Sequence, residues 1–194
     1  MSRKQQKLNF SHLSGKGVKV AIVDSGVDST HPGVGALAGG IAFSAGPEGR
    51  ISSEPDFSDC VGHGTACAGI IRRKAVDAEL YSVRIFDVSL ATEAKILIAA
   101  LEWAIYLKVD VVNLSLGSTD VSLVSDLVSV CRQAQKAGVL VVAAEHNEGR
   151  QSYPAMLPEV IGVASGAGGG VHDYSFRSGA AIECVARGNL QRLC

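Results

Sequence analysis

Apolar residues gather in short continuous runs along the chain, and glycine or polar turn residues separate the runs. A run of this kind, rich in β-branched residues, predicts a strand buried on both faces. We expect strands at residues 18–23, 80–86, 109–116, 139–144 and 160–164. The segment 33–58 is rich in Gly, Ser and Pro, so it predicts surface loops around one short strand at 40–43.

Helical periodicity lies between these strands. Apolar residues at 96, 100, 103 and 107 predict a helix capped by Thr92, and a second helix is expected from about 122 to 137, where Gly138 ends it. Strands that alternate with helices, and that are apolar on both faces, favour an α/β fold. We predict three layers, with a mainly parallel sheet covered by helices on both faces.

The composition indicates one domain that binds neither nucleic acid nor membrane. The chain has 194 residues, 47% of them hydrophobic, which suits a single core. Its 18 Lys and Arg balance 19 Asp and Glu, so no net field attracts polyanions. No apolar stretch is typical of a signal peptide or a membrane span, and five scattered cysteines do not suggest a disulfide framework. We therefore expect a cytoplasmic protein with mostly reduced cysteines.

Polar residues follow several of the predicted strands. Asp24, Ser115, Gly117 and Asn147 all lie at carboxyl ends, where catalytic groups collect in parallel sheets. His63 begins a predicted helix of small residues, whose dipole disfavours imidazolium, so His63 could act as a neutral general base. Taken singly, each has an ordinary alternative: Asp24 and Asn147 as turn residues, and His63 as a packed or surface histidine.

Four segments in order resemble the signature blocks of the subtilases, a family of serine proteases. They are VAIVDSGVDSTHP at 20–32, GHGTACAGI at 62–70, VVNLSLG at 111–117 and VVAAEHNEG at 141–149. The resemblance covers about residues 15–180 and divides the chain into an N-terminal extension, 1–14, and a subtilisin-like catalytic-domain portion, 15–194.

The resemblance implies a role for each matching residue. Asp24 corresponds to the aspartate that orients the histidine, His63 to the general base and Asn147 to the oxyanion-hole amide. Ser115, Leu116 and Gly117 correspond to the edge that pairs with an extended peptide substrate.

Other positions depart from the family pattern. Glu145 and His146 stand where small residues commonly line the specificity pocket, and 89–92 is bulkier than the usual glycine-rich second edge. Both departures favour a selective peptidase. Cys67 resembles the thiol of one subtilase branch, although a small buried hydrophobe is the more ordinary interpretation.

The sequence contains no Gly-Thr-Ser-x-Ala block, which carries the nucleophile in this family. It ends after residues 181–186, which resemble the strand that precedes that block. We therefore expect a C-terminally truncated serine endopeptidase, inactive as this chain alone, whose serine helix comes from a missing segment or a partner. A pseudoprotease that binds peptides or a partner is the alternative.

Two further alternatives involve a cofactor. Cys60, His63 and Cys67 have a spacing that could suit zinc, but a fourth ligand is lacking. Gly15 and Gly17 precede the first strand, whereas a dinucleotide-binding loop must follow it. We expect no cofactor and no metal site, and the sequence gives no support for a structural calcium ion.

Overall fold

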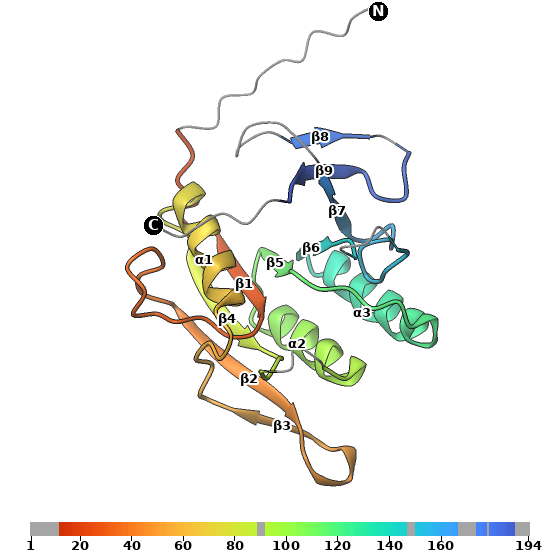
Figure 1. The fold of residues 1–194 in the computed structure, drawn as a ribbon, viewed down its shortest axis with the longest axis horizontal. Helices are drawn as coiled ribbons and strands as arrows, with labels where there is room; N and C mark the ends of the chain where they lie inside the picture. Colours follow the sequence, from red (N-terminus) through yellow and green to blue (C-terminus); the bar gives the residue numbers. More distant parts are fainter. Residues whose placement is uncertain (1–11, 89–91, 147–149, 167–173, 178, 189–194) are drawn as a thin grey trace, which may run out of the picture.

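A single mixed sheet runs through the molecule (Figure 1). The computed structural model describes residues 12–88, 92–146, 150–166, 174–177 and 179–188. Within them, nine strands pair in the order β3-β2-β4-β1-β5-β6-β7-β9-β8, and all neighbours are parallel except β2–β3 and β8–β9. The strands are β1 Lys19–Asp24, β2 Gly39–Ala45, β3 Ile51–Glu54, β4 Glu79–Arg84, β5 Val111–Leu114, β6 Leu140–Ala144, β7 Ile161–Gly166, β8 Tyr174–Phe176 and β9 Cys184–Arg187.

The central strand β1 packs on both faces, as its continuous apolar run predicts. Val20 and Ile22 point to the face where Ala68 packs, and Ala21 and Val23 belong to the larger cluster on the opposite face. Successive side chains of a strand point to opposite faces, so this division follows from the pleat.

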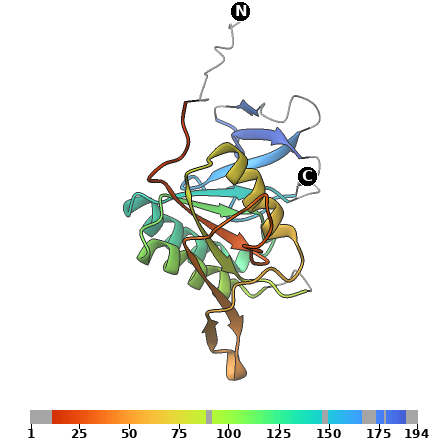
Figure 2. The same ribbon diagram turned by 90° about the vertical axis from the view of Figure 1, so that its left-hand side faces the viewer.

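Helices cover the two faces, and the predicted three-layer arrangement is confirmed. Helix α1, His63–Lys74, lies on one face, whereas α2, Ala94–Tyr106, and α3, Val124–Lys136, lie together on the other (Figure 2). None of the helices in the described residues is long and apolar enough to cross a bilayer.

Two helix boundaries differ from the prediction. Thr92 does not cap α2: Glu93 is the N-cap, with extended backbone (φ −86°, ψ 146°), so the predicted cap is wrong by one residue. Helix α3 begins only after a separate 3-10 turn, Val121–Leu123, which Asp120 caps through the Ser122 amide. Gly138 has a φ of 78° just beyond α3 and is the predicted stop.

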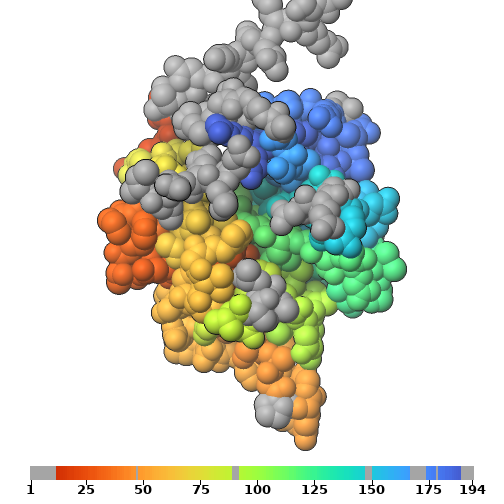
Figure 3. All heavy atoms as spheres, in the orientation of Figure 1, coloured from red at the N-terminus to blue at the C-terminus, as the bar shows by residue number. Residues whose placement is uncertain are grey.

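The sheet has antiparallel strands at both edges that were not predicted. Every residue of β3 is exposed, and the β2–β3 hairpin projects from one end of the molecule (Figure 3). β8 is likewise exposed along its length. Such strands lack the apolar run by which the central strands were recognised, so their pairing was not visible in the sequence.

Two glycines allow the start of α1 to approach the end of β1. Gly26 has a φ of 100°, and a Cβ added there would lie 2.4 Å from the Ser58 carbonyl oxygen. A Cβ on Gly64 would lie 2.1 Å from the carbonyl oxygen of Gly26. Backbone therefore lies against backbone at this point, which brings the first turn of α1 next to Asp24.

We predict that Gly64→Ala destabilises the fold by about 1–3 kcal/mol, because the added methyl group must displace backbone. This sign is opposite to the gain of about 1 kcal/mol that alanine usually brings over glycine in a helix. The free energy of unfolding from urea denaturation is the measurement.

Gly39→Ala is the matched control, since its added Cβ would meet only the Tyr81 ring at 3.5 Å, an ordinary contact. It should be neutral or stabilising by at most about 1 kcal/mol. Equal effects of the two substitutions would contradict the close approach at Gly64.

Candidate active site

Asp24 ends β1 and is completely buried. Its Oδ1 accepts a hydrogen bond of 2.7 Å from the backbone amide of Ser25. The Asp24 carboxylate therefore lies at the carboxyl edge of the sheet. Asp24 is the last residue of β1, whereas the sequence predicted a strand that ends at residue 23. A buried carboxylate needs such donors and a cationic or polar partner.

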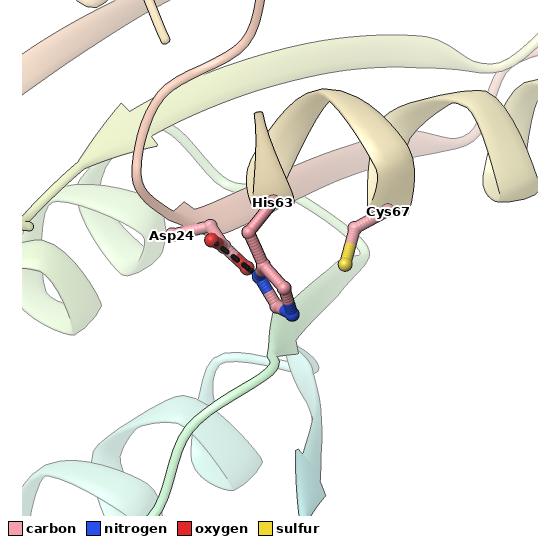
Figure 4. Close-up of side chains that lie close together, drawn as sticks. All are labelled: Asp24, His63 and Cys67. Carbon is pink, nitrogen blue, oxygen red and sulfur yellow. Dashed lines mark hydrogen bonds and ion pairs between the residues drawn. The ribbon is translucent and has the colours of Figure 1, made fainter. Parts of the chain in front are cut away.

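His63 supplies that partner. It is the first residue of α1, and its Nδ1 lies 2.8 Å from Asp24 Oδ1 and 2.9 Å from Oδ2 (Figure 4). The imidazole is 48% exposed, whereas the Asp24 side chain is 1% exposed. Asp24 fixes one ring nitrogen while the rest of the ring remains accessible, which is the arrangement that an acid–base pair requires.

The pKa of His63 is raised above the ordinary histidine value. The hydrogen bond with Asp24 is the largest cause; burial acts in the opposite direction, and the negative charges of Asp24 and Asp59 add to the rise. The helix N-terminus alone predicts a neutral ring. That prediction is wrong in sign, because a carboxylate in direct contact outweighs the partial charge of a helix dipole.

The exposed side of His63 faces a cavity of about 550 Å³. Its other walls are formed by the loops after β5 and β6, the first half of α2, and the side chains of Phe86, Leu123 and Leu127. All the described residues predicted to contact substrate lie in this lining: Ser115, Leu116, Gly117, Glu145 and His146. Thr92, from the bulkier second edge, lines it too, while residues 89–91 lie outside the described residues.

The Ser115 hydroxyl has two close polar neighbours. Its hydroxyl accepts a hydrogen bond of 2.9 Å from Asn113 Nδ2 and lies 3.2 Å from Cys67 Sγ. Burial raises the pKa of the Cys67 thiol to about 11 despite the hydrogen bond with Ser115. At neutral pH Cys67 is therefore a thiol, the unreactive form, on a half-buried side chain.

Asp24, His63 and Cys67 offer ligand atoms that all lie within 4.8 Å of one another, and they are the only such group of three in the described part of the chain. Cys60, which the zinc alternative required, is not a member. Its Sγ lies 3.5 Å from the carbonyl oxygens of Ser25 and Phe86. The hydrogen bond between Asp24 and His63 already explains why these two residues are close.

Ser152 was not predicted, yet it joins the two loops that line the cavity. Its buried hydroxyl accepts a hydrogen bond of 3.0 Å from the His146 amide, and a Cβ on Gly117 would lie 3.0 Å from the same oxygen. Next to it, Ser118 and Tyr153 form a two-way backbone bridge of 2.8 Å in each direction. In the sequence, position 152 is an ordinary loop serine, which carries no signal for this role.

Asn147, predicted as the oxyanion-hole amide, lies outside the described residues. Its neighbour His146 is described at the end of the β6 loop, where Arg150 Nη2 lies 3.3 Å from His146 Nε2. The role of Asn147 stays a prediction.

Comparison with known proteins places this geometry in context. Residues 15–191 match the model of the subtilase family. The chain is 36% identical over 171 residues to a thermostable alkaline protease of Halalkalibacterium halodurans, covering 82% of this chain and 44% of that protein. It is 34% identical over 178 residues to subtilisin E of Bacillus subtilis, with 84% and 44% covered. The chain thus spans less than half the length of these relatives.

Solved structures show the same fold. A lanthipeptide protease superposes with a TM-score of 0.72 at 25% identity, covering 93% of this chain and 58% of that one. A cold-adapted subtilisin-like serine proteinase gives a TM-score of 0.67 at 22% identity, with 91% and 64% covered. On the family match and the relatives together, the chain belongs to the subtilase family.

Proposed function

We propose that this chain carries the acid–base half of a subtilisin-type serine endopeptidase, in which Asp24 orients His63 and His63 transfers the proton during acyl transfer. The observation that carries the proposal is the contact of His63 Nδ1 with both oxygens of the buried Asp24, beside a cavity that the other ring edge can reach. The family supports a peptide or protein as the substrate class.

In this mechanism, the free edge of His63 takes the proton from an attacking serine hydroxyl and later gives it to the leaving amine. Asp24 stabilises the imidazolium that forms in between. A raised pKa for His63 suits the first step, because a more basic ring accepts the serine proton more readily and carries it until the ring protonates the leaving amine. Asn147 would donate to the oxyanion.

An extended peptide would lie against Ser115, Leu116 and Gly117, next to His63 in the same cavity. Main-chain hydrogen bonds to such an edge give affinity without strong sequence preference. Selectivity would come from the walls, where Glu145 and His146 replace the small residues common in the family. We propose selective cleavage in the cytoplasm, with no metal or organic cofactor.

These 194 residues contain no segment that matches the family's nucleophilic serine. The sequence has no Gly-Thr-Ser-x-Ala block, and Ser115 and Cys67 are engaged with one another. We infer that these 194 residues do not hydrolyse peptides by themselves. The same observation favours a second candidate, a pseudoprotease that binds an extended peptide or a partner chain at the edge beside His63.

We predict that an active-site fluorophosphonate does not label the purified 194-residue chain and that the chain turns over no peptide in a panel of unstructured substrates. The reason is that His63 has no serine hydroxyl to deprotonate. Mass spectrometry of the treated chain and chromatography of the peptides are the measurements. Labelling of one serine with turnover would overturn the claim of inactivity.

Sequencing the reading frame beyond Cys194 distinguishes the endopeptidase hypothesis from the pseudoprotease hypothesis. If a Gly-Thr-Ser block follows, the longer product should be labelled on that serine. His63→Ala should abolish its turnover, Asp24→Asn should lower it by about 10⁴-fold, and His31→Ala should leave it unchanged. If no such block follows, the chain is a binding module, and peptide affinity measured by calorimetry should fall when Gly117→Val narrows the edge.

We predict that Asp24→Asn lowers the midpoint of the His63 titration, because the negative charge is removed and the neutral amide oxygen is a weaker acceptor for the His63 ring. The pair stabilises the folded protein fully at pH values below the ordinary histidine pKa, and this contribution is lost as pH rises through the raised folded value. Asp24→Asn should therefore cost more stability at pH 5.5 than at pH 9.

Histidine NMR titration and urea unfolding at the two pH values are the measurements. Asp110→Asn is the matched control, since the Asp110 carboxylate binds the Lys19 amide at the opposite end of β1. An unchanged His63 midpoint in Asp24→Asn would show that the pair does not form.

A further inference from the structure

A second carboxylate lies beside the acid–base pair and contacts neither ring nor substrate edge. Asp59 precedes α1 and is partly buried. Its Oδ1 accepts hydrogen bonds of 2.9 and 2.7 Å from the amides of Val61 and Gly62, and its Oδ2 accepts one of 2.8 Å from the amide of Thr65. The Thr65 hydroxyl donates to Oδ2 as well, at 2.5 Å. These donors flank His63 on both sides.

The same carboxylate reaches the residue that follows Asp24. Ser25 Oγ donates to Asp59 Oδ1 at 2.9 Å and accepts a hydrogen bond of 3.1 Å from the amide of Gly64. Ser25 also donates its own amide to Asp24. Asp59 and Ser25 together thus connect the backbone on either side of His63 with the backbone on the carboxyl side of Asp24.

Two other hydrogen bonds connect these segments, from the Cys60 amide to the Ser25 carbonyl oxygen at 3.2 Å and from the Asp28 amide to the Thr65 hydroxyl at 2.9 Å, but both have neutral acceptors. The glycine contact between Gly64 and Gly26 brings them close, but it is a van der Waals contact and has no preferred direction. Hydrogen bonds to a fixed carboxylate are directional and, when charged, stronger than those between neutral groups. A shift of a few tenths of an ångström between the two segments would change the length of the His63–Asp24 hydrogen bond and so weaken it.

Asp59 is ionised where the pair functions. Burial acts to raise the pKa of Asp59, but the hydrogen bonds from Thr65, Gly62 and Val61 together hold it below the ordinary aspartate value. Its charge is also one of the causes of the raised pKa of His63. The carboxylate therefore keeps its acceptor capacity throughout the neutral range.

We propose that Asp59 is the positioning residue of the acid–base pair: it ties the first turn of α1 to Ser25 and so holds the His63 ring against the Asp24 carboxylate. The importance of this role rests on the proposed function, but the geometry itself can be tested without any catalysis.

The experiment compares Asp59→Asn with Asp56→Asn in the whole chain. Asp56 is a matched control, because its exposed carboxylate lies in the same loop and accepts hydrogen bonds from the amide and side chain of Ser58. The readouts are the downfield proton resonance of the hydrogen-bonded His63 Nδ1, the midpoint of the His63 titration and the free energy of unfolding.

We expect Asp59→Asn to weaken or abolish the downfield resonance and to lower the titration midpoint, because one half of the amide offers donors where the bonds need acceptors. Asp56→Asn should leave both at wild-type values. The other ionisable groups near the ring are Asp24, Cys67 and the cavity-lining Glu145 and His146. The His63 midpoint is also measured in Glu145→Gln, which shows how much of any change comes from the Glu145 charge and how much from the Asp59 charge.

A merely structural helix cap would give a different result: Asp59→Asn would lower the free energy of unfolding while the resonance and the midpoint stayed at wild-type values. That outcome overturns the proposal. If Asp59→Asn does not fold, Ser25→Ala decides, since it keeps the Asp59 bonds to Val61, Gly62 and Thr65 and removes the hydroxyl that connects Asp59 and Gly64 to the Asp24 side. A weakened resonance in Ser25→Ala supports the proposal, and an unchanged one overturns it.

The result does not depend on the proposed peptidase activity. The readouts are made on a chain without the serine block, so a failure to find hydrolysis in a longer product would leave them unaffected. Conversely, an intact His63–Asp24 pair in Asp59→Asn would overturn the positioning role and leave the proposed function standing.

Discussion

The close approach of α1 to the end of β1 is the constraint on which the site depends. Gly26 and Gly64 let backbone pass against backbone, and this brings His63 within hydrogen-bond distance of a completely buried Asp24. A Cβ at Gly64 would collide with the Gly26 carbonyl oxygen, and one at Gly26 would collide with the Ser58 carbonyl oxygen. The packing around the His63–Asp24 pair therefore depends on both glycines.

The short distance between His63 and the Asp24 carboxylate determines the direction of the His63 pKa shift. The N-terminus of α1 acts against a charged imidazole, while the Asp24 carboxylate at 2.8 Å acts in its favour and prevails. The outcome is a basic histidine on a buried acid. Nearby, burial keeps the Cys67 thiol protonated, so the one sulfur beside the pair does not compete with it.

The central strands and the family segments could be predicted because both are local patterns. A buried strand such as β1 shows itself as a continuous apolar run, and Asp24 and His63 lie in segments whose order is distinctive. The exposed strands β3 and β8 carry no such run, so only their partners reveal them. Asp59 and Ser152 were missed for a related reason. They bind backbone amides across the fold, and an Asp or Ser in a loop is ordinary in sequence.

The two faces of the sheet are packed by very different side chains. Helix α2 buries Ile96, Leu97 and Leu101, whereas the residues that α1 buries are glycine, alanine and threonine. Small side chains permit the close approach at the site but bury little apolar area, so α1 has less holding it to the sheet. Regions with little buried apolar surface exchange their amide protons through local opening, at a lower cost than global unfolding. We therefore expect the α1 face, which carries the acid–base pair, to open at a lower free-energy cost than the α2–α3 face, so that loss of the pair on heating can precede the melting of the whole domain.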